Sequence, residues 1–159
     1  MGTKLIKRIL GANCTAGGVF LAVTTGTGAD FKVISTEQLA FSMETADGII
    51  DLHRTLRIFL ANARSEGVER IAVLKCSSGP RGSSVDAIKA EAILELISAA
   101  EVSLQIQRVA PQGLPKTLDC DSGQKWRVRA KQLFNPKGEI KHWNGTDGAV
   151  CAAYKAATL

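Results

Sequence analysis

RILGANCTAGGVFLAV, residues 8–23, contains two apolar runs joined by small and polar residues. Apolar runs of this length, bounded by turn-forming residues, are typical of β-strands. The segment therefore predicts two antiparallel strands, over 7–13 and 17–25. Gly26-Thr27-Gly28 is a second turn signal, so residues 31–41 are expected to add a third strand to a meander.

Beyond this meander, the sequence alternates helical and strand patterns. Residues 46–64 repeat apolar side chains every three or four positions, which predicts a helix, and the apolar run 70–76 is typical of a buried parallel strand. Three antiparallel strands followed by α/β units predict one α/β domain over 1–159, with a mixed five-stranded sheet and helices on both faces. The remaining elements are expected to be helices at 85–100, 123–134 and 146–158, a fifth strand at 102–109, and a short helix or turn at 111–118.

The composition is that of an ordinary globular protein, with 45% hydrophobic and 22% charged residues among 159. The net charge of +5 permits an anionic partner without requiring one. No apolar run approaches the length of a membrane span, and the apolar block at Ile9-Leu10 is too short for a signal peptide, so we expect a cytoplasmic protein without membrane contact. The four cysteines have no metal-type spacing and are expected to be free thiols, although a redox or metal pair of Cys14 and Cys76 stays open.

Three segments resemble RuvC-type Holliday-junction resolvases, which have the ribonuclease H-like fold. RILGANCTAGGVFLAV is similar to the first hairpin of that family, ERIAVLKC (69–76) to its fourth strand, and GTDGAVCAAYKA (145–156) to its final helix. The segments occur in the family's order and cover most of the chain. The resemblance implies the ribonuclease H-like fold, and in the family these segments carry acids that hold divalent metal ions for nucleic-acid cleavage.

This sequence departs from the family at most of the acidic positions. Asn13 stands where the resemblance places the first Asp, Lys75 or Cys76 where it places the Glu, and Asn144 and Asp147 where it places a terminal acidic pair. Two hard divalent cations need several carboxylate oxygens. We therefore expect a pseudoenzyme without catalytic residues, bound metal or other cofactor, in which Asn13, Lys75, Asn144 and Asp147 form a vestigial site.

Lys75 has two expected roles in this vestigial site. It is either the counter-ion of Asp147 or a binder of a substrate anion. The alternative is purely structural: Asn13 makes turn hydrogen bonds, Asp147 favours a helix N-terminus, and Lys75 is solvated.

The loop in KCSSGPRGSSVDAIKAEA (75–92) is a candidate anion-binding site. Its glycines allow close approach to the backbone, and the helix that follows offers free N–H groups. Lys89 is expected near the middle of the apolar face predicted for this helix. That face consists of Ile88, Ala92, Ile93, Leu96, Ile97 and Ala100. The alternative is a flexible, serine-capped connection. The candidate anion-binding residues are Ser77, Ser78, Arg81, Ser83 and Lys89.

The segment GQKWRVRAKQLFNPKGEIKHW (123–143) interleaves basic and aromatic residues. This pattern favours phosphate contacts combined with base stacking. An amphipathic helix that buries its aromatic residues is equally compatible with the sequence, and so is a dimer contact made by the same aromatics. The candidate nucleic-acid-binding residues are Lys125, Trp126, Arg127, Arg129, Lys131, Lys141 and Trp143.

The leading functional hypothesis is a non-catalytic, RuvC-like binder of nucleic acid (junction, duplex or single strand) or another anionic partner, acting as a homodimer. A second hypothesis is an altered nuclease that depends on Mg²⁺ or Mn²⁺ and uses Asp147 with Glu91 or Asp86. A third is a domain that binds phosphate or another small anion through the loop, and a fourth is a purely structural interaction protein.

Overall fold

The computed structural model describes residues 8–76 and 84–158 of the chain. Its single sheet has the order β3-β2-β1-β4-β5 and is built from β1 (Arg8–Thr15), β2 (Gly18–Thr25), β3 (Lys32–Leu39), β4 (Val68–Leu74) and β5 (Gln105–Val109). The helices are α1 (Ala46–Ser65), α2 (Val85–Leu96), α3 (Leu114–Thr117), α4 (Trp126–Phe134) and α5 (Trp143–Ala157).

The sheet is mixed, as the sequence predicts. β2 is antiparallel to both β1 and β3, whereas β4 is parallel to both β1 and β5. Because β1 and β4 are parallel neighbours, their carboxyl ends lie together, and Asn13 pairs with Leu74 in register. The strand-end residues of these two strands therefore share one edge of the sheet.

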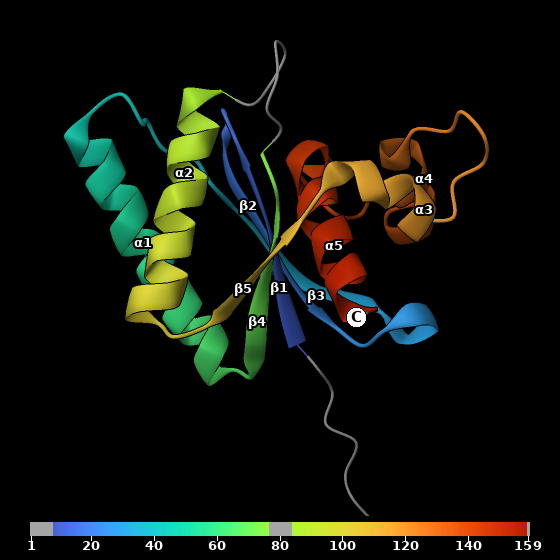
Figure 1. The fold of residues 1–159 in the computed structure, drawn as a ribbon, viewed down its shortest axis with the longest axis horizontal. Coiled ribbons are helices and arrows are strands. Elements are labelled where there is room, and N and C mark those ends of the chain that lie inside the picture. The colour runs from blue at the N-terminus through green and yellow to red at the C-terminus, as the bar shows by residue number, and fades with distance from the viewer. Residues whose placement is uncertain (1–7, 77–83, 159) are drawn as a thin grey trace, which may run out of the picture.

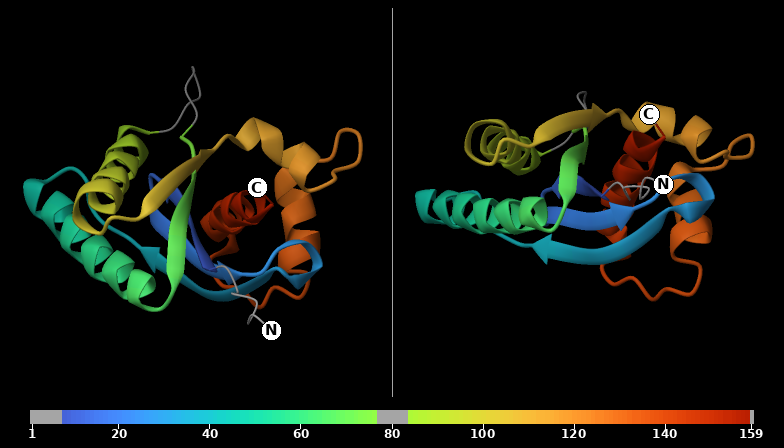
Figure 2. Two further views of the ribbon diagram at one scale, coloured as in Figure 1. Left: turned by 60° about the horizontal axis from the view of Figure 1, so that its bottom comes forward. Right: turned by 90° about the horizontal axis from the view of Figure 1, so that it is seen from below.

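Helices cover both faces of the sheet. α1 and α2 lie on one face, and α5 lies on the other with α3 and α4 beside it (Figures 1 and 2). Alternation along β1 divides the core accordingly: Leu10 packs in the cluster that contains Leu52 and Leu56 of α1, and Ile9 packs in the cluster that contains Ala152 of α5. None of the helices within 8–76 and 84–158 combines the length and apolar character needed to cross a membrane.

Small residues bring α5 very close to β1. A Cβ atom added at Gly11 would lie 1.8 Å from the backbone oxygen of Ala149, and one added at Gly148 would lie 2.5 Å from Nδ2 of Asn13. Side chains at these positions would push helix and strand apart. The glycines therefore place Asp147 next to the end of β1.

Several predicted boundaries are wrong by a few residues. α2 ends at Leu96 and is followed by one wider, π-helical turn at Ile97–Glu101, so β5 begins at Gln105 rather than at 102. α4 begins at Trp126 rather than at 123. α5 begins at Trp143, but its backbone is not helical at Asn144 and Gly145, and the regular helix starts at Thr146, as predicted.

The packing face predicted for the 85–100 helix is right for Ile97, which is buried, and in part for Ile93, but wrong for α2 otherwise. The residues that α2 buries are Ala87, Ala90, Glu91 and Leu94, whereas Ile88 and Leu96 are 53% and 59% exposed. Lys89 is consequently exposed instead of lying on the packed face. The helix carries apolar residues on every side, so its sequence does not single out the stripe that faces the sheet.

Candidate functional site

Two hollows share Arg127 as a lining residue, one at the carboxyl ends of β1 and β4 and the other between α4 and α5. The first, which we call the strand-end hollow, has a volume of about 560 Å³ and is lined by residues that include Asn13, Thr15, Lys75, Cys76, Gln112, Trp126 and Arg127. The second, the α4–α5 groove, has a volume of about 580 Å³ and is lined by Arg127, Val128, Lys131, Gln132, Pro136, Trp143, Asn144 and Asp147.

Asp147 is buried and uses both of its carboxylate oxygens. Oδ2 accepts a hydrogen bond from Nη1 of Arg127 at 2.8 Å, and Oδ1 accepts from the backbone N–H groups of Gly145 at 3.1 Å and Gly148 at 2.7 Å. The side chain of Asp147 is 4% exposed and that of Arg127 is 50% exposed. A buried carboxylate requires such partners because the loss of water disfavours its charge.

Arg127 is held from two sides. Its guanidinium carbon lies 4.6 Å from the ring centroid of Trp126, which precedes it at the start of α4. A guanidinium has five N–H donors, and the structure commits one of them to Asp147. The half of the side chain that remains exposed can therefore donate hydrogen bonds to an anion in either hollow.

Asn13 ties the end of β1 to the beginning of α5. Its side chain is buried, and Nδ2 donates to the backbone oxygen of Gly145 at 2.9 Å. A carboxylate at this position would have no hydrogen to donate to that oxygen. Asn13 therefore has a clear structural role at the place where the resemblance would put an acid.

Lys75 is not the ion-pair partner of Asp147, so the prediction of a Lys75–Asp147 pair is wrong. The residue that pairs with Asp147 is Arg127, while the exposed side chain of Lys75 lines the strand-end hollow. The reason is that the first turn of α4 brings Arg127 to Asp147 at the start of α5. Of the vestigial set, the structure places Asn13 and Lys75 in one hollow and Asn144 and Asp147 in the other.

Two cysteines that line the strand-end hollow lie together, and a buried acid is bonded to one of them. Sγ of Cys76 is 3.9 Å from the backbone oxygen of Cys14, and Glu91 accepts a hydrogen bond from the backbone N–H of Cys76 at 3.1 Å. Burial, and after it the neighbouring Cys76, Glu91 and Glu95, raise the pKa of the Cys14 thiol far above its ordinary value. The Cys14 thiol therefore stays neutral and is a poor metal ligand.

The residues of the two hollows do not fit a pair of divalent metal ions. Asp147 is the one carboxylate among the described residues that line them, and hydrogen bonds already occupy both of its oxygens. Within 8–76 and 84–158, no three His, Cys, Asp or Glu side chains gather where they could hold a metal ion. Mg²⁺ and Mn²⁺ prefer several oxygen ligands, which these hollows do not supply.

The structure divides the predicted nucleic-acid-binding residues. Trp126, Arg127, Lys131 and Trp143 line the two hollows, whereas Lys125 lines neither, and Arg129 donates from Nε to the backbone oxygen of Leu118. The expectation that α4 buries one apolar side holds for Ala130, which is buried, and in part for Trp126 and Phe134. Leu133 remains exposed.

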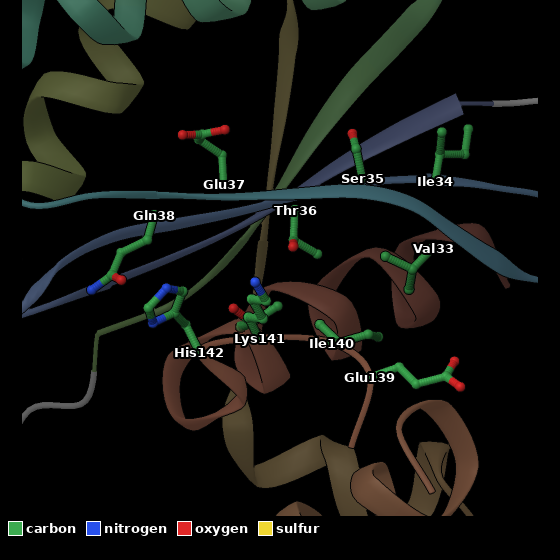
Figure 3. Close-up of a pocket in the computed structure, with 11 residues that line it drawn as sticks. Val33, Ile34, Ser35, Thr36, Glu37, Gln38, Glu139, Ile140, Lys141 and His142 are labelled. Atoms are coloured by element: carbon green, nitrogen blue, oxygen red, sulfur yellow. The ribbon is translucent and has the colours of Figure 1, made fainter. Parts of the chain in front are cut away.

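Lys141 lies in a third hollow, between β3 and the segment before α5. This hollow has a volume of about 460 Å³ and is lined by residues 33–38, 139–142 and 146. Figure 3 shows Val33, Thr36 and Gln38 facing the segment that carries Lys141 and His142. Lys141 is therefore separated from the basic residues of α4 that line the α4–α5 groove.

The predicted anion-binding loop is mostly outside the described residues, which exclude Ser77, Ser78, Arg81 and Ser83. Ser84, at its end, caps α2 by accepting a hydrogen bond from the backbone N–H of Ala87. Lys89 lines neither the strand-end hollow nor the α4–α5 groove.

Sequence reasoning did not assign Val128, Gln132 or Pro136 to a site, although all three line the α4–α5 groove. Val128 and Gln132 carry a weak signal, because they lie four positions apart and so share one side of the helix, next to the side that carries Arg127 and Lys131. Pro136 carries no such signal, since its place depends on how the chain turns after α4.

No protein-family model matches the sequence, and no curated protein is similar enough to count as a relative. Among solved structures, Thermus thermophilus RuvC is similar over 95% of this chain and 96% of its own, with a TM-score of 0.72 and 14% identity. The same organism's RuvC in complex with Holliday junction substrate is similar over 94% and 92%, with a TM-score of 0.72 and 13% identity. A yeast mitochondrial Holliday junction resolvase is similar over 92% of this chain and 78% of its own, with a TM-score of 0.62 and 13% identity. These likenesses show that the chain has the RuvC-type, ribonuclease H-like fold.

Proposed function

We propose that this protein binds nucleic acid through side-chain cations and does so without divalent metal ions or cleavage. The observation that carries the proposal is the ion pair between the buried Asp147 and Arg127, the residue that lines both the strand-end hollow and the α4–α5 groove. In this pair a guanidinium lies beside the retained acid, where the resemblance implies a metal ion.

The cations around the two hollows suit a phosphate backbone. Lys75 follows β4, and Arg127 and Lys131 lie one helical turn apart on α4, so three positive charges line the two hollows. Asp147 offsets one of them, which leaves a net positive site. Arg127 adds a planar set of donors that matches the oxygens of a phosphate.

Solved relatives of the fold support nucleic acid as the anion. Thermus thermophilus RuvC has been solved with a Holliday junction substrate, and its chain matches this one over nearly its whole length. The shared fold offers a similar frame for a nucleic acid to lie against. The absence of a carboxylate cluster from the described hollows is the reason to separate binding from cleavage.

Fluorescence anisotropy with labelled junction, duplex and single-stranded DNA and RNA tests this proposal at low salt. We expect binding of at least one of these nucleic acids, with the same affinity in excess EDTA as in Mg²⁺. The affinity should fall with salt, and the slope of log K against log salt is about −0.7 to −0.9 per phosphate contacted. Failure to bind any of them would contradict the proposal.

A cleavage assay on the same nucleic acids distinguishes a non-catalytic binding protein from the altered nuclease. We expect no cleavage in Mg²⁺ or Mn²⁺, because one engaged carboxylate cannot hold the ions. Metal-dependent cleavage that disappears in the Asp147→Asn variant would contradict the non-catalytic assignment and establish the altered nuclease instead.

We also infer that the protein is a homodimer that associates through α1 and α2. These helices lie side by side on the sheet face opposite α5 (Figure 1), and both expose large apolar side chains, Ile50 and Ile58 on α1 and Ile88 and Leu96 on α2. Exposed apolar side chains on two neighbouring helices favour association of two copies about a two-fold axis. The contact would then lie away from the aromatic residues of the basic segment.

Light scattering coupled to gel filtration tests the dimer. We expect twice the mass of the chain for the wild type and the mass of one chain for Ile88→Glu. Ile34→Glu, which places the same charge on an exposed residue of β3, is the matched control and should leave the dimer intact. A wild type that is monomeric at all concentrations would contradict this assignment.

A further inference from the structure

We propose that the strand-end hollow and the α4–α5 groove together bind an unpaired, single-stranded segment of nucleic acid, with one base in the groove against Trp143. This inference rests on the proposed function and adds the class of substrate. It depends on the shape and lining of the two hollows and on the position of Arg127 between them.

The two hollows lie on either side of one residue. Because Arg127 lines both, a phosphate bound at its guanidinium lies next to each hollow. Each hollow, at about 560 and 580 Å³, is within the range of sites for small organic molecules. A phosphate at Arg127 would therefore have room for one nucleoside on each side.

The α4–α5 groove has the lining of a base site. Trp143, Val128 and Pro136 supply apolar surface, and the two cations Arg127 and Lys131 lie one turn apart on the α4 wall. The only carboxylate among its described lining residues, Asp147, is already paired with Arg127 and does not repel a phosphate with an unbalanced charge. Apolar and aromatic walls next to cations suit a stacked base attached to its phosphate.

The strand-end hollow also combines an aromatic ring with cations. Trp126 lines it, and the guanidinium of Arg127 lies over the Trp126 ring. A base can stack on a guanidinium plane as well as on an aromatic ring. Lys75 is exposed in the same hollow and is available to the next phosphate.

A duplex cannot use these walls. Its bases are stacked on one another and present only their edges, so the ring of Trp143 would meet backbone instead of a base face. A single strand can turn its bases outward into hollows, as sequence-tolerant single-strand binders do. The expected preference for single strand over duplex is about ten-fold, the effect of one stacked base.

Tryptophan fluorescence tests the placement directly, because the sequence has two tryptophans. Phenylalanine can replace either of them and keeps an aromatic ring at that position while it removes the indole emission. In the Trp126→Phe variant the emission comes from Trp143 alone. We expect a single-stranded oligothymidylate to quench this emission strongly and a duplex of the same length to quench it weakly. Absence of quenching, while anisotropy shows that the oligonucleotide is bound, would overturn the proposal.

Lysine substitutions supply a second readout that does not depend on aromatic packing. Lys131→Ala, at an exposed position in the groove, should lower the salt slope for single-strand binding by about 0.7. Lys32→Ala, at an exposed position of β3 that lines none of the three hollows, should leave the slope unchanged. Equal effects of the two substitutions would overturn the placement in the groove.

The competing outcomes are distinct. Binding of duplex or junction with the same affinity as single strand would overturn this inference and leave the proposed function intact. Absence of binding to any nucleic acid would overturn both.

Discussion

Loss of the Arg127–Asp147 ion pair should destabilise the fold measurably, and the perturbation to make is a double-mutant cycle with Arg127→Met and Asp147→Asn. Methionine keeps much of the apolar stem of Arg127 and removes the guanidinium, with its charge, its donors and its contact with the Trp126 ring. Asparagine keeps the shape of Asp147 and its oxygen for the backbone N–H groups. The cycle therefore isolates the charged contact.

The magnitude follows from the burial of the two partners. Exposed ion pairs contribute about 0–1 kcal/mol, and removing one partner of a fully buried pair costs about 3–5 kcal/mol. Here the side chain of Asp147 is 4% exposed but that of Arg127 is 50% exposed, so solvent screens the pair in part. We expect Arg127→Met to cost about 2 kcal/mol and the coupling energy to be about 1–2 kcal/mol.

Urea unfolding at fixed pH and salt gives the four free energies, and thermal unfolding provides a check. For a domain of this size a loss of about 2 kcal/mol lowers Tm by roughly 4–8 °C. Arg129→Met is the matched control, because Arg129 lies on the same helix but donates to a neutral backbone oxygen. Its effect should add to that of Asp147→Asn without coupling. A coupling energy for Arg127 and Asp147 below about 0.5 kcal/mol, the usual error of additivity, would refute the reasoning.

Two further predictions concern the packing around α5 and the buried thiols. Gly11→Ala should destabilise the fold by about 3 kcal/mol or more in urea unfolding, because the added Cβ would lie 1.8 Å from the backbone oxygen of Ala149. Gly17→Ala is the control and should cost less than about 1 kcal/mol, because the nearest atom to its added Cβ is 3.7 Å away. Equal effects of the two substitutions would contradict the close packing of α5 on β1. Burial raises the pKa of the Cys14 and Cys151 thiols in the folded protein. Above a pH of about 8.5 these thiols therefore lose their protons in the unfolded state but keep them in the folded state. The free energy of unfolding should then fall by about 1.4 kcal/mol per pH unit for each thiol, with no such contribution at lower pH. Cys14→Ala should remove one such contribution from the pH dependence of unfolding, and an unchanged slope would contradict it.

Much of the fold could be predicted because its signals are local. The apolar runs around Gly11 and the three- and four-residue spacing in 46–64 reflect which side of each element meets the core. The order of the elements left open whether β1 and β4 are neighbours. In the structure they are, and Asn13 therefore meets the end of β4. The resemblance added the fold family through three segments in the right order.

The packing of α2 could not be predicted in the same way. Its larger apolar residues, such as Ile88, suggest one stripe, but the helix packs through Ala87, Ala90 and Leu94, which allow a closer approach to the sheet. Glu91 belongs to that buried stripe because it accepts a hydrogen bond from the end of β4. A helix that is apolar on all sides gives no periodic signal for this choice.

The most consequential error at the site was to predict Lys75, and not Arg127, as the ion-pair partner of Asp147. Strand-end reasoning brings Lys75 close to Asp147, whereas the position of α4 depends on the connecting segments at 119–125 and 135–142, whose course has no simple sequence signal. One clue was present: Asp147 is surrounded in sequence by Gly145, Gly148 and Ala149, which predicts burial, and a buried carboxylate requires a cation or several donors. The nearest basic helix in the sequence supplies that cation.

The central claim is that side-chain cations, and not metal ions, hold the nucleic acid. The most direct test is the affinity for a single-stranded oligonucleotide in excess EDTA and then in Mg²⁺, for the wild type and for Arg127→Lys. We predict one Kd for the wild type in both buffers, and a weaker Kd in both for Arg127→Lys, because lysine keeps the charge but loses the planar donors. A wild-type Kd that improves by about ten-fold or more when Mg²⁺ replaces EDTA would contradict the claim.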